Sequence, residues 1–294
     1  MELSQLIYFQ KSAELHSISK AAETMHVSQP TVSIAIKKLE DELGLPVFDH
    51  TKKPLSLTGF GKQLLTRVDS IMFEIKNIRL EATDYMENKK VKVRLGLPLT
   101  LCNELIYYLK KDFCSENPNI DLFLFQYGTE EISRKVAAEE LDIGITCIPD
   151  SSHLHYTNLK EVEFYAYLSP ESELAGYDHL TPQLLSGQNL LITDTTISEI
   201  EQNIIRYLRK ENVTGNYTNS GILFPESSLI LAELKEGIAL LSKHATMGNI
   251  KVLKKPIVPP LKIPLCIIWN KNLYLSSSHK KLISFIKKSD FIFD

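Results

Sequence analysis

Polar and basic side chains recur at helical spacing in the segment SQPTVSIAIKK at 28–38. Gln29, Ser33 and Lys37 are four residues apart, so a helix here would place them on one face. Amide, hydroxyl and ammonium groups on such a face can donate hydrogen bonds to phosphates and base edges of DNA. The segment holds two lysines and no acid, although the whole chain has a net charge of −3. These residue types suit the recognition of a polyanion.

A second basic segment without acids lies at 50–68, HTKKPLSLTGFGKQLLTRV. Its cations are Lys52, Lys53, Lys62 and Arg67. Local placement matters more for phosphate contact than the average charge of a domain. The sequence therefore separates two short basic segments from the acidic run at 40–42.

The elements that position these residues follow from apolar spacing. Leu3, Leu6, Ile7 and Phe9 predict a first helix, and SISKAAETM predicts a short second helix capped by Ser19. Ser28 is the expected cap of a third helix with Pro30 in its first turn, and Gly44 ends it. The inner face of this third helix is apolar: Val32, Ile36, Leu39 and Leu43. Small alanines on the second helix allow the close packing that a helix-turn-helix requires.

A two-stranded wing is predicted after the third helix. Val47 and Phe48 form one short apolar run, and Leu55 alternates with Leu57 in another. The turn between them, KKP, would place Lys52 and Lys53 at the tip, near a phosphate backbone or a minor groove.

The string SISKAAETMHVSQPTVSIAIKKLEDELGLPVFDHTKKPLSLTGFG resembles the signature of the LysR family of transcription regulators. The resemblance implies that residues 1–60 form a winged helix-turn-helix whose third helix enters the major groove. The residues it assigns to DNA are Gln29, Pro30, Thr31, Ser33, Ile34, Lys37, Lys52 and Lys53. Two features depart from the family pattern: Ile34 replaces a frequent arginine, and Asp49-His50 replaces Glu-Arg. Ile34 suits a thymine methyl group, while Thr31 fits a base contact and a capping role equally well.

A long helix is predicted over 61–90. Its apolar positions repeat with alternating gaps of four and three: Leu64, Val68, Ile71, Ile75, Ile78, Ala82 and Tyr85. Such a heptad seam fits pairing with a second copy, and packing on its own domain is the alternative. LysR-type proteins pair through this helix, so a homodimer or homotetramer is expected.

Residues 91–294 alternate apolar runs with predicted helices, a pattern typical of α/β domains with mostly parallel strands. Two lobes are expected, the first about 91–162 plus 268–294 and the second about 163–267. The whole chain is therefore an α+β multidomain protein. PNIDLFL, ELDIGI, YLSPESELA and EGIALLS resemble landmarks of the LysR effector domain, which is similar to periplasmic solute-binding proteins.

Hydroxyl side chains stand where the predicted strands of this domain lead into helices. They are Thr100, Thr129, Thr195 and Thr196, the last in a capping box with Glu199. Each of them suits a plain helix cap, and helix N-termini can together hold an anion. The resemblance places an effector between the lobes, against Thr100, Thr129 and the segments near 193–196 and 222–226. An anionic effector is therefore expected.

Enzyme classes find little support in the sequence. P-loop, GxGxxG, HExxH and GxSxG motifs are absent, so no cofactor and no catalytic residue is expected. His153 and His155 lack a third metal ligand nearby, and no metal site is predicted. Cys102, next to Thr100, leaves a cysteine-based redox sensor as an alternative. A solute-binding protein or an enzyme without a DNA role is a weaker alternative.

The N-terminus has no signal-peptide pattern, and no apolar run is long enough to span a membrane, so a cytoplasmic protein without a membrane partner is expected. The sequence predicts a sequence-specific transcription regulator modulated by a small molecule. Its expected partners are double-stranded DNA, the effector and further copies of itself, with RNA polymerase as an additional candidate.

Overall fold

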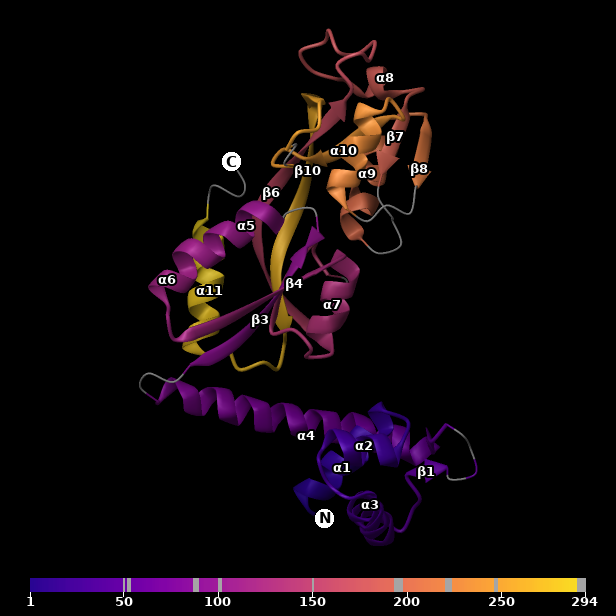
Figure 1. Cartoon of the computed structure of the whole chain (residues 1–294), viewed down its shortest axis with the longest axis vertical. Helices are drawn as coiled ribbons and strands as arrows, with labels where there is room; N and C mark the ends of the chain where they lie inside the picture. Colours follow the sequence, from indigo (N-terminus) through magenta and orange to yellow (C-terminus); the bar gives the residue numbers. More distant parts are fainter. Residues whose placement is uncertain are drawn as a thin grey trace. The chain divides into compact units, whose positions relative to one another are not determined.

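A computed structural model describes residues 1–49, 51, 54–86, 90–99, 102–149, 151–192, 198–219, 224–245 and 248–289 (Figure 1). Packing divides the chain into two compact units, Met1–Ala82 and Thr83–Asp294. The division falls inside the helix that the sequence predicts as a linker. The predicted domain limits of 1–60, 61–90 and 91–294 stay predictions.

The first unit begins with three helices around one apolar core: α1 (Leu3–Glu14), α2 (Ile18–Thr24) and α3 (Gln29–Leu43). Phe9, Val32 and Leu39 are fully buried at their contact. Ala21 is also fully buried, as a close approach of α2 and α3 requires. The helix-turn-helix predicted from the small residues is thus present.

The cap of α2 differs from the prediction. Ser17, not Ser19, is the N-cap, because its hydroxyl accepts a hydrogen bond from the Lys20 backbone N–H at 3.3 Å. The backbone at His16 adopts a positive φ of 50°, and the helix begins two residues earlier than the sequence suggested. Ser19 lies inside the helix. The prediction for Ser19 was wrong, since two serines at 17 and 19 compete for the same role.

The wing follows α3. Strand β1 (Phe48–Asp49) pairs antiparallel with β2 (Ser56–Leu57), and α4 (Gly59–Asp84) begins directly afterwards. The Thr58 hydroxyl accepts from the Gly61 N–H at 2.9 Å and donates to the Pro46 carbonyl at 2.8 Å, which ties the start of α4 to the wing. A Cβ at Gly61 would collide with the Val47 carbonyl oxygen, so this position needs glycine.

The second unit is built on a mixed sheet. Among the described residues, eight strands follow the order β4-β3-β5-β10-β6-β9-β7-β8. Their bounds are β3 (Val91–Pro98), β4 (Ile120–Tyr127), β5 (Ile143–Thr146), β6 (Leu154–Leu168), β7 (Asn189–Ile192), β8 (Asn216–Asn219), β9 (Ile238–Ser242) and β10 (Leu253–Asn270). The outer pairs are parallel as predicted, but β6 and β10 run antiparallel to each other and to β9 and β5. These two strands extend well beyond their apolar runs and join the two halves of the unit.

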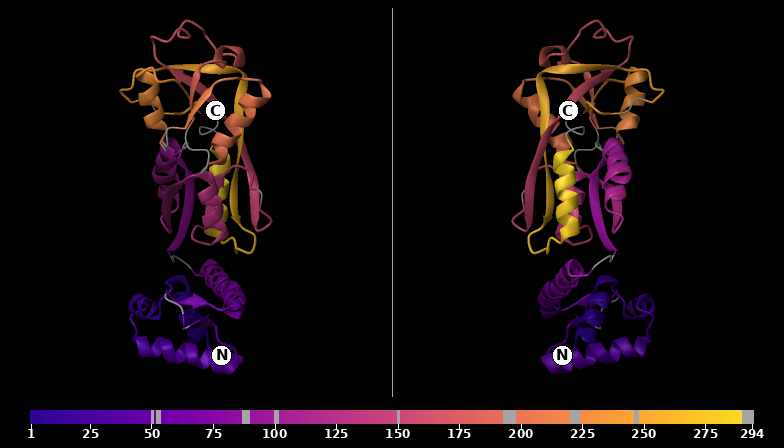
Figure 2. Two further views of the ribbon diagram at one scale, coloured as in Figure 1. Left: turned by 90° about the vertical axis from the view of Figure 1, so that its right-hand side faces the viewer. Right: turned by 90° about the vertical axis from the view of Figure 1, so that its left-hand side faces the viewer.

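Helices cover both faces of this sheet (Figures 1 and 2). They are α5 (Cys102–Tyr108), continued by the π-helical turn η2 (Leu109–Phe113) and α6 (Cys114–Glu116), then α7 (Thr129–Ala137), α8 (Pro182–Leu185), α9 (Glu199–Lys210), α10 (Pro225–Glu233) and α11 (Ser277–Lys288). Side chains alternate along β10: Ile267 packs in the cluster with α5 and α11, while Ile268 packs in the cluster with α7. The helix α7 therefore covers the opposite face.

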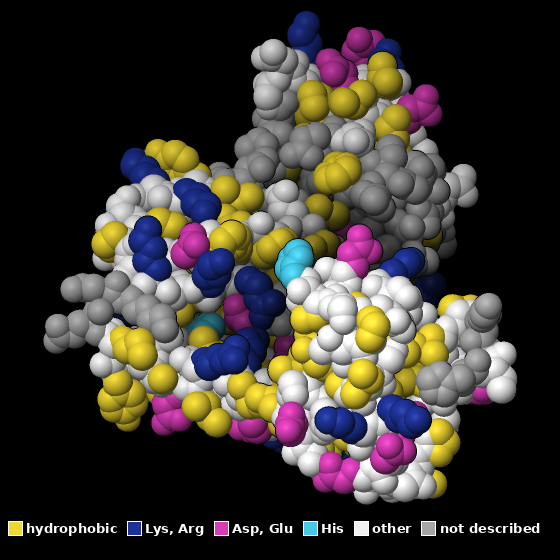
Figure 3. Space-filling view, turned by 60° about the horizontal axis from the view of Figure 1, so that its bottom comes forward, with side chains coloured by type: hydrophobic (Ala, Val, Ile, Leu, Met, Phe, Trp, Pro, Cys, Tyr) yellow, Lys and Arg dark blue, Asp and Glu magenta, His cyan; other side chains and the backbone are white. Residues whose placement is uncertain are grey.

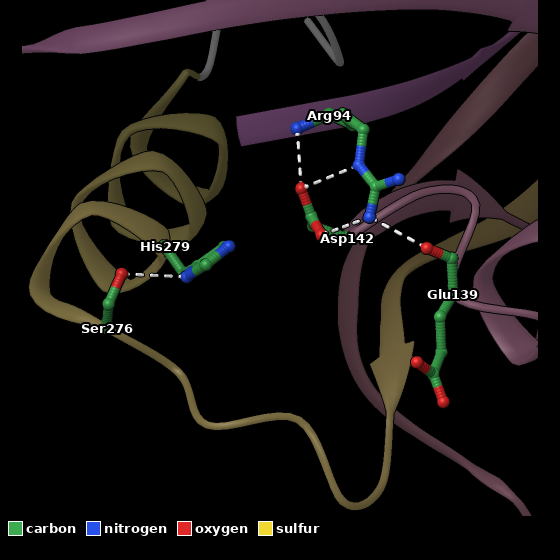
Figure 4. A network of polar contacts seen from close by, with 5 residues as sticks. All are labelled: Arg94, Glu139, Asp142, Ser276 and His279. Carbon is green, nitrogen blue, oxygen red and sulfur yellow. Dashed lines mark hydrogen bonds and ion pairs between the residues drawn. The ribbon is translucent and has the colours of Figure 1, made fainter. Parts of the chain in front are cut away.

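A partly buried ion pair links β3 to the residue that precedes β5 (Figure 4). The Arg94 guanidinium donates to both carboxylate oxygens of Asp142, at 2.8 and 3.2 Å, and to the Glu139 carbonyl at 2.7 Å. Asp142 is only 4% exposed and also accepts the Arg94 backbone N–H. Nearby, the fully buried His279 of α11 is hydrogen-bonded through Nδ1 to the Ser276 hydroxyl at 2.8 Å. The contacts of Arg94 tie β3 to the start of β5, and the Ser276–His279 bond lies at the start of α11.

Candidate functional site

The outer face of α3 carries the polar residues that the sequence singled out. Gln29, Pro30, Thr31, Ile34 and Lys37 are exposed. The opposite face of the same helix is buried in the core of the first unit. The apolar face of α3 stays packed in the core, so the polar face can enter a DNA groove while the fold of the first unit is unchanged.

Local hydrogen bonds organise the start of this face. The Ser28 hydroxyl accepts the Thr31 N–H at 3.3 Å and lies 2.7 Å from the Thr31 hydroxyl, so Ser28 is the cap that was predicted. Gln29 donates its side-chain amide to the half-buried Ser33 hydroxyl at 2.7 Å. Three groups on this face remain available to a ligand: the side-chain amide oxygen of Gln29 and the side chains of Ile34 and Lys37. Thr31 still fits both a capping role and a base contact, because its hydroxyl lies 2.7 Å from the Ser28 hydroxyl and its side chain is exposed.

Glu40 is a positioning residue that the sequence analysis missed. Its carboxylate accepts the backbone N–H groups of Val47 at 2.7 Å and Phe48 at 3.3 Å. The end of α3 is thereby fixed to the first strand of the wing. A signal was available, because acids near a helix C-terminus oppose the helix dipole and need another reason to be there.

At the wing tip, His50, Lys52 and Lys53 lie outside the described residues. Figure 3 shows basic, acidic and apolar side chains interspersed over the face in view, without one uniformly basic surface. For contact with DNA phosphates, the placement of charge along α3 matters more than the average charge of the surface.

The seam predicted on α4 is open in its second half. Val68 is fully buried, whereas Ile71 is 41% and Ile78 65% exposed. Exposed apolar residues at heptad spacing along a 26-residue helix are typical of a helix that pairs with another.

Thr129 lies at the start of α7 and contacts the start of α9, two helices that Figure 1 labels. It is the first residue of α7, after the cap residue Gly128, and it is 1% exposed. Its hydroxyl accepts the Glu199 N–H at 2.7 Å and lies 3.3 Å from the Ser198 hydroxyl. The N-termini of α7 and α9 are thus joined through one threonine side chain. Thr100, Thr195 and Thr196 lie outside the described residues.

The capping box predicted at Thr196 and Glu199 is not present as proposed. Ser198 is the N-cap of α9, and its hydroxyl accepts the Ile200 N–H at 3.3 Å. Glu199 is then the first helical residue rather than the third. The helix starts two residues later than predicted, with the Ile200 N–H bonded to Ser198 and the Glu199 N–H bonded to Thr129. The contact with Thr129 joins residues 70 positions apart, so no local sequence pattern could indicate it.

A cavity of about 740 Å³ adjoins the predicted effector loops. Leu99, Gly128 and Phe224 line it, and each lies next to or within a segment that the family resemblance assigned to the effector. The remaining described lining comes from the ends of β4 and β6, the loop before β6, and α7: Gln126, Tyr127, Glu130, Glu131, Ser133, Arg134, Ala137, Ser151 and Leu154. The lining combines apolar surface with both signs of charge, as small-molecule sites commonly do.

Two buried cysteines, Cys147 and Cys266, lie near Glu199 at the start of α9. Burial raises the pKa of the Cys147 thiol to about 12, with the nearby Glu199 carboxylate adding to the shift, and burial likewise raises the pKa of Cys266 to about 12. Cys266 donates to the Cys147 carbonyl at 3.3 Å. Thiols with such a pKa stay protonated at neutral pH and are poor nucleophiles. The side chain of Cys102 is outside the described part of the structure.

No group of three or more His, Cys, Asp or Glu side chains among the described residues is arranged to hold a metal ion. None of the helices described is both long and apolar enough to cross a membrane.

Comparison with known families decides the assignment. Residues 3–62 match the profile of the bacterial regulatory helix-turn-helix protein of the lysR family, and residues 88–290 match the LysR substrate binding domain. The chain belongs to the LysR family. LysR-type regulators bind DNA through the first of these domains and a small molecule through the second, so the predicted family, fold class and kind of function are confirmed.

Two curated relatives illustrate the range of this LysR family. The chain is 25% identical to the uncharacterized HTH-type transcriptional regulator YybE of Bacillus subtilis, over 94% of each chain. It is 26% identical to the Hca operon transcriptional activator HcaR of Escherichia coli, over 92% of each chain. Both names denote transcription regulators rather than enzymes.

Solved structures show the same LysR architecture over the full length. A full-length OxyR variant from Pseudomonas aeruginosa superimposes with a TM-score of 0.73 at 21% identity, covering 99% of this chain and 94% of the other. CbnR, a LysR family transcriptional regulator, does so with a TM-score of 0.66 at 16% identity over 100% of both chains. At these identities the likeness establishes the fold.

Proposed function

We propose that this LysR-type regulator reads a specific DNA sequence with the exposed face of α3 and responds to a small anionic molecule bound in its second unit. The observation that carries the DNA half is the row of Gln29, Ser33 and Lys37 opposite the buried face of α3. Pro30, Thr31 and Ile34 would complete the contact surface, with Lys52 and Lys53 on the wing. The protein would act in the cytoplasm, where its DNA is, and carry out no reaction of its own.

Two adjacent lysines on α3 allow a matched test of the DNA half. Lys37 lies on the proposed contact face, while Lys38 is also exposed but is turned by about 100° around the helix. Lys37→Gln should weaken binding to the chain's own upstream DNA by roughly tenfold or more, and Lys38→Gln much less. Fluorescence anisotropy with a labelled duplex measures both, and equal affinities of Lys37→Gln and the unmodified protein would remove Lys37 from the interface.

We place the effector at the junction of α7 and α9, with Thr100, Thr129, Thr195 and Thr196 as its polar contacts. Support comes from the cavity beside Leu99, Gly128 and Phe224, and from the meeting of two helix N-termini at Thr129. Helix N-termini carry partial positive charge, which favours an anionic group. In the described structure the Thr129 hydroxyl donates to the Ser198 hydroxyl and accepts the Glu199 N–H. An anionic ligand oxygen would accept the Thr129 O–H in place of Ser198, or accept the Glu199 N–H in place of Thr129.

Such a replacement supplies a physical route for regulation. An effector that inserts between α7 and α9 binds one arrangement of the two halves more tightly than another and shifts their populations. The change in the second unit would then alter the placement of paired DNA-binding units. RNA polymerase is a candidate recipient of that change.

The effector half is testable by thermal shift with a panel of small carboxylates and amino-acid metabolites. A compound that raises the unfolding temperature of the unmodified protein should do so less in Thr100→Val. The same compound should retain its full effect in the matched control Thr214→Val, which changes an exposed threonine of the same unit that does not line the cavity. An undiminished shift in Thr100→Val would discredit the proposed contacts.

The two buried thiols do not support redox sensing, because burial raises the pKa values of Cys147 and Cys266 to about 12. The alternative based on Cys102 concerns a side chain outside the described part of the structure. The small-molecule effector remains the function that the structure favours.

A further inference from the structure

The last helix of the second unit presents an exposed face of a single charge sign. All of its charged residues except the buried His279 are lysines: Lys280, Lys281, Lys287 and Lys288. At 100° per residue these four side chains, with the exposed Ser284 between them, fall within about one third of the helix circumference. The opposite face is buried, with Leu282 and Ile286 fully enclosed. We call this exposed row the α11 lysine stripe.

Other helices of the unit do not share this pattern. On α7, Glu130 and Glu131 precede Arg134 and Lys135, and the two signs form ion pairs at 3.5 to 3.8 Å. On α9, acids occupy the first turn and Arg209 and Lys210 the last. Mixed signs arranged along the helix dipole are the ordinary means of keeping a helix soluble and stable. The α11 lysine stripe contains no acid to balance it.

Few of these lysines are used inside the unit. Lys287 donates to the Thr157 hydroxyl at 3.1 Å, a neutral partner. Lys280 lies near the Asp84 carboxylate and 6.0 Å from the Tyr274 ring centre. No ion pair of Lys281 or Lys288 occurs among the described residues, and these two lie seven residues apart, about 10.5 Å along the axis.

The beginning of the stripe lies where the chain enters the second unit. Asp84, the last residue of α4, accepts the Ser277 N–H at 3.0 Å, the Ser277 hydroxyl at 2.8 Å and the Tyr274 hydroxyl at 3.1 Å. These bonds lower the pKa of the Asp84 carboxyl against the opposing effect of burial, so it stays ionised and caps α11. The α11 lysine stripe therefore starts beside the segment that leads to the DNA-binding unit.

We infer that the α11 lysine stripe binds the phosphate backbone of the same DNA that α3 reads, outside the bases that α3 contacts. DNA is the occupant because the family binds it and because its phosphates complement an unbalanced row of ammonium groups. Lys281 and Lys288, about 10.5 Å apart along the helix axis, can each contact one phosphate of the same duplex. The contact would be independent of sequence and would lengthen the bound region beyond the winged helix-turn-helix.

The test compares two double variants of the full-length chain. Lys281→Gln/Lys288→Gln removes the two lysines without an internal ion pair. The control, Lys210→Gln/Lys251→Gln, removes two exposed lysines elsewhere in the same unit. Binding to the upstream DNA is measured from 50 to 300 mM salt, on a long duplex and on one trimmed to the bases that α3 protects.

The stripe variant should lose about 1.8 from the slope of log affinity against log salt, because each phosphate contact contributes about 0.9. At 0.15 M salt the affinity for the long duplex should fall roughly 30-fold, and the preference for specific over unrelated DNA should stay the same. The trimmed duplex and the control variant should show little change.

Three results would overturn the inference. An unchanged slope in the stripe variant, or an equal loss in the control variant, would show that the stripe does not touch DNA. A normal slope combined with lost transcription in a purified polymerase assay would assign the stripe to an acidic protein surface instead. The inference rests on DNA binding by α3, whose failure would appear separately as no binding by the unmodified chain.

Discussion

At the residue scale, the side chains on the contact face of α3 follow from sequence spacing, whereas the residues that hold the wing in place do not. Gln29 and Lys37 are exposed and open to a ligand, as their types and spacing predict. Glu40 and Thr58 instead hold the wing against the helices through backbone N–H and carbonyl groups. Such side-chain to backbone contacts depend on the folded path of the chain, and neither residue could be assigned from spacing alone.

Glu40 gives a first prediction. Glu40→Gln keeps one oxygen as an acceptor but removes the charge, and hydrogen bonds from N–H groups to a charged acceptor contribute about 1.5 to 3 kcal/mol. We expect the free energy of unfolding of the first unit to fall by about 1.5 kcal/mol. Urea unfolding followed by circular dichroism measures this change. Asp41→Asn, an exposed neighbour, should change it by less than about 0.5 kcal/mol. Equal effects of the two changes would contradict the role of Glu40.

The buried thiols give a second prediction. At pH 8 iodoacetamide should modify the half-buried Cys114 in the native chain but leave Cys147 and Cys266 unmodified, as site-resolved mass spectrometry can measure. In the unfolded chain these thiols have the ordinary pKa of 9.0 and lose their protons above that pH. In the folded chain Cys147 and Cys266 keep their protons until about pH 12. Their contribution to stability is therefore complete below pH 9 and is lost as the pH rises toward 12. Rapid native labelling of Cys147 would contradict this and reopen redox sensing.

At the scale of the elements, the sequence predicts where helices and strands occur better than where they end. Apolar periodicity located α1, α3 and α4, and Ser28 and Gly44 marked both ends of α3. The caps of α2 and α9 were misplaced, because several hydroxyl residues stand close together and tertiary contacts select one. The length of β6 and β10 was also missed, since their polar ends are held by pairing with each other rather than by burial.

The start of α4 gives a third prediction, with its control on the same helix. Gly61→Ala drives a methyl group into the Val47 carbonyl and should destabilise the first unit by about 1 to 3 kcal/mol. Gly59→Ala meets nothing within 4 Å and should be neutral or stabilise by up to about 1 kcal/mol. Thermal unfolding of both variants checks the difference, and a stable Gly61→Ala would show that the wing does not pack against α4 as described.

At the scale of the whole molecule, two compact units combine a DNA reader with a ligand-responsive domain. The family resemblance predicted this organisation, and composition and net charge contributed nothing to it. The contacts of the effector were less predictable, because Thr129 is occupied by α9 and the remaining threonines lie outside the described residues. Which oxygen atoms face a ligand depends on how two distant segments meet, and that is a property of the tertiary structure.

Self-association gives a fourth prediction at this scale. Ile78 is 65% exposed on the heptad seam of α4, and an aspartate there would place a charge in the paired interface. Ile78→Asp should convert dimers or tetramers to smaller species in sedimentation velocity, whereas Arg79→Asp, one residue off the seam, should not. Unchanged assembly of Ile78→Asp would assign the seam to packing within one chain.

The central claim is that this chain recognises DNA through the α3 face, and the most direct test is binding of the purified full-length protein to its own upstream region across a salt series. We expect salt-sensitive binding that selects particular fragments from a genomic library and is weakened by Lys37→Gln with the fold intact. Absence of binding to the upstream region, together with no fragment selected from the genome, would contradict it.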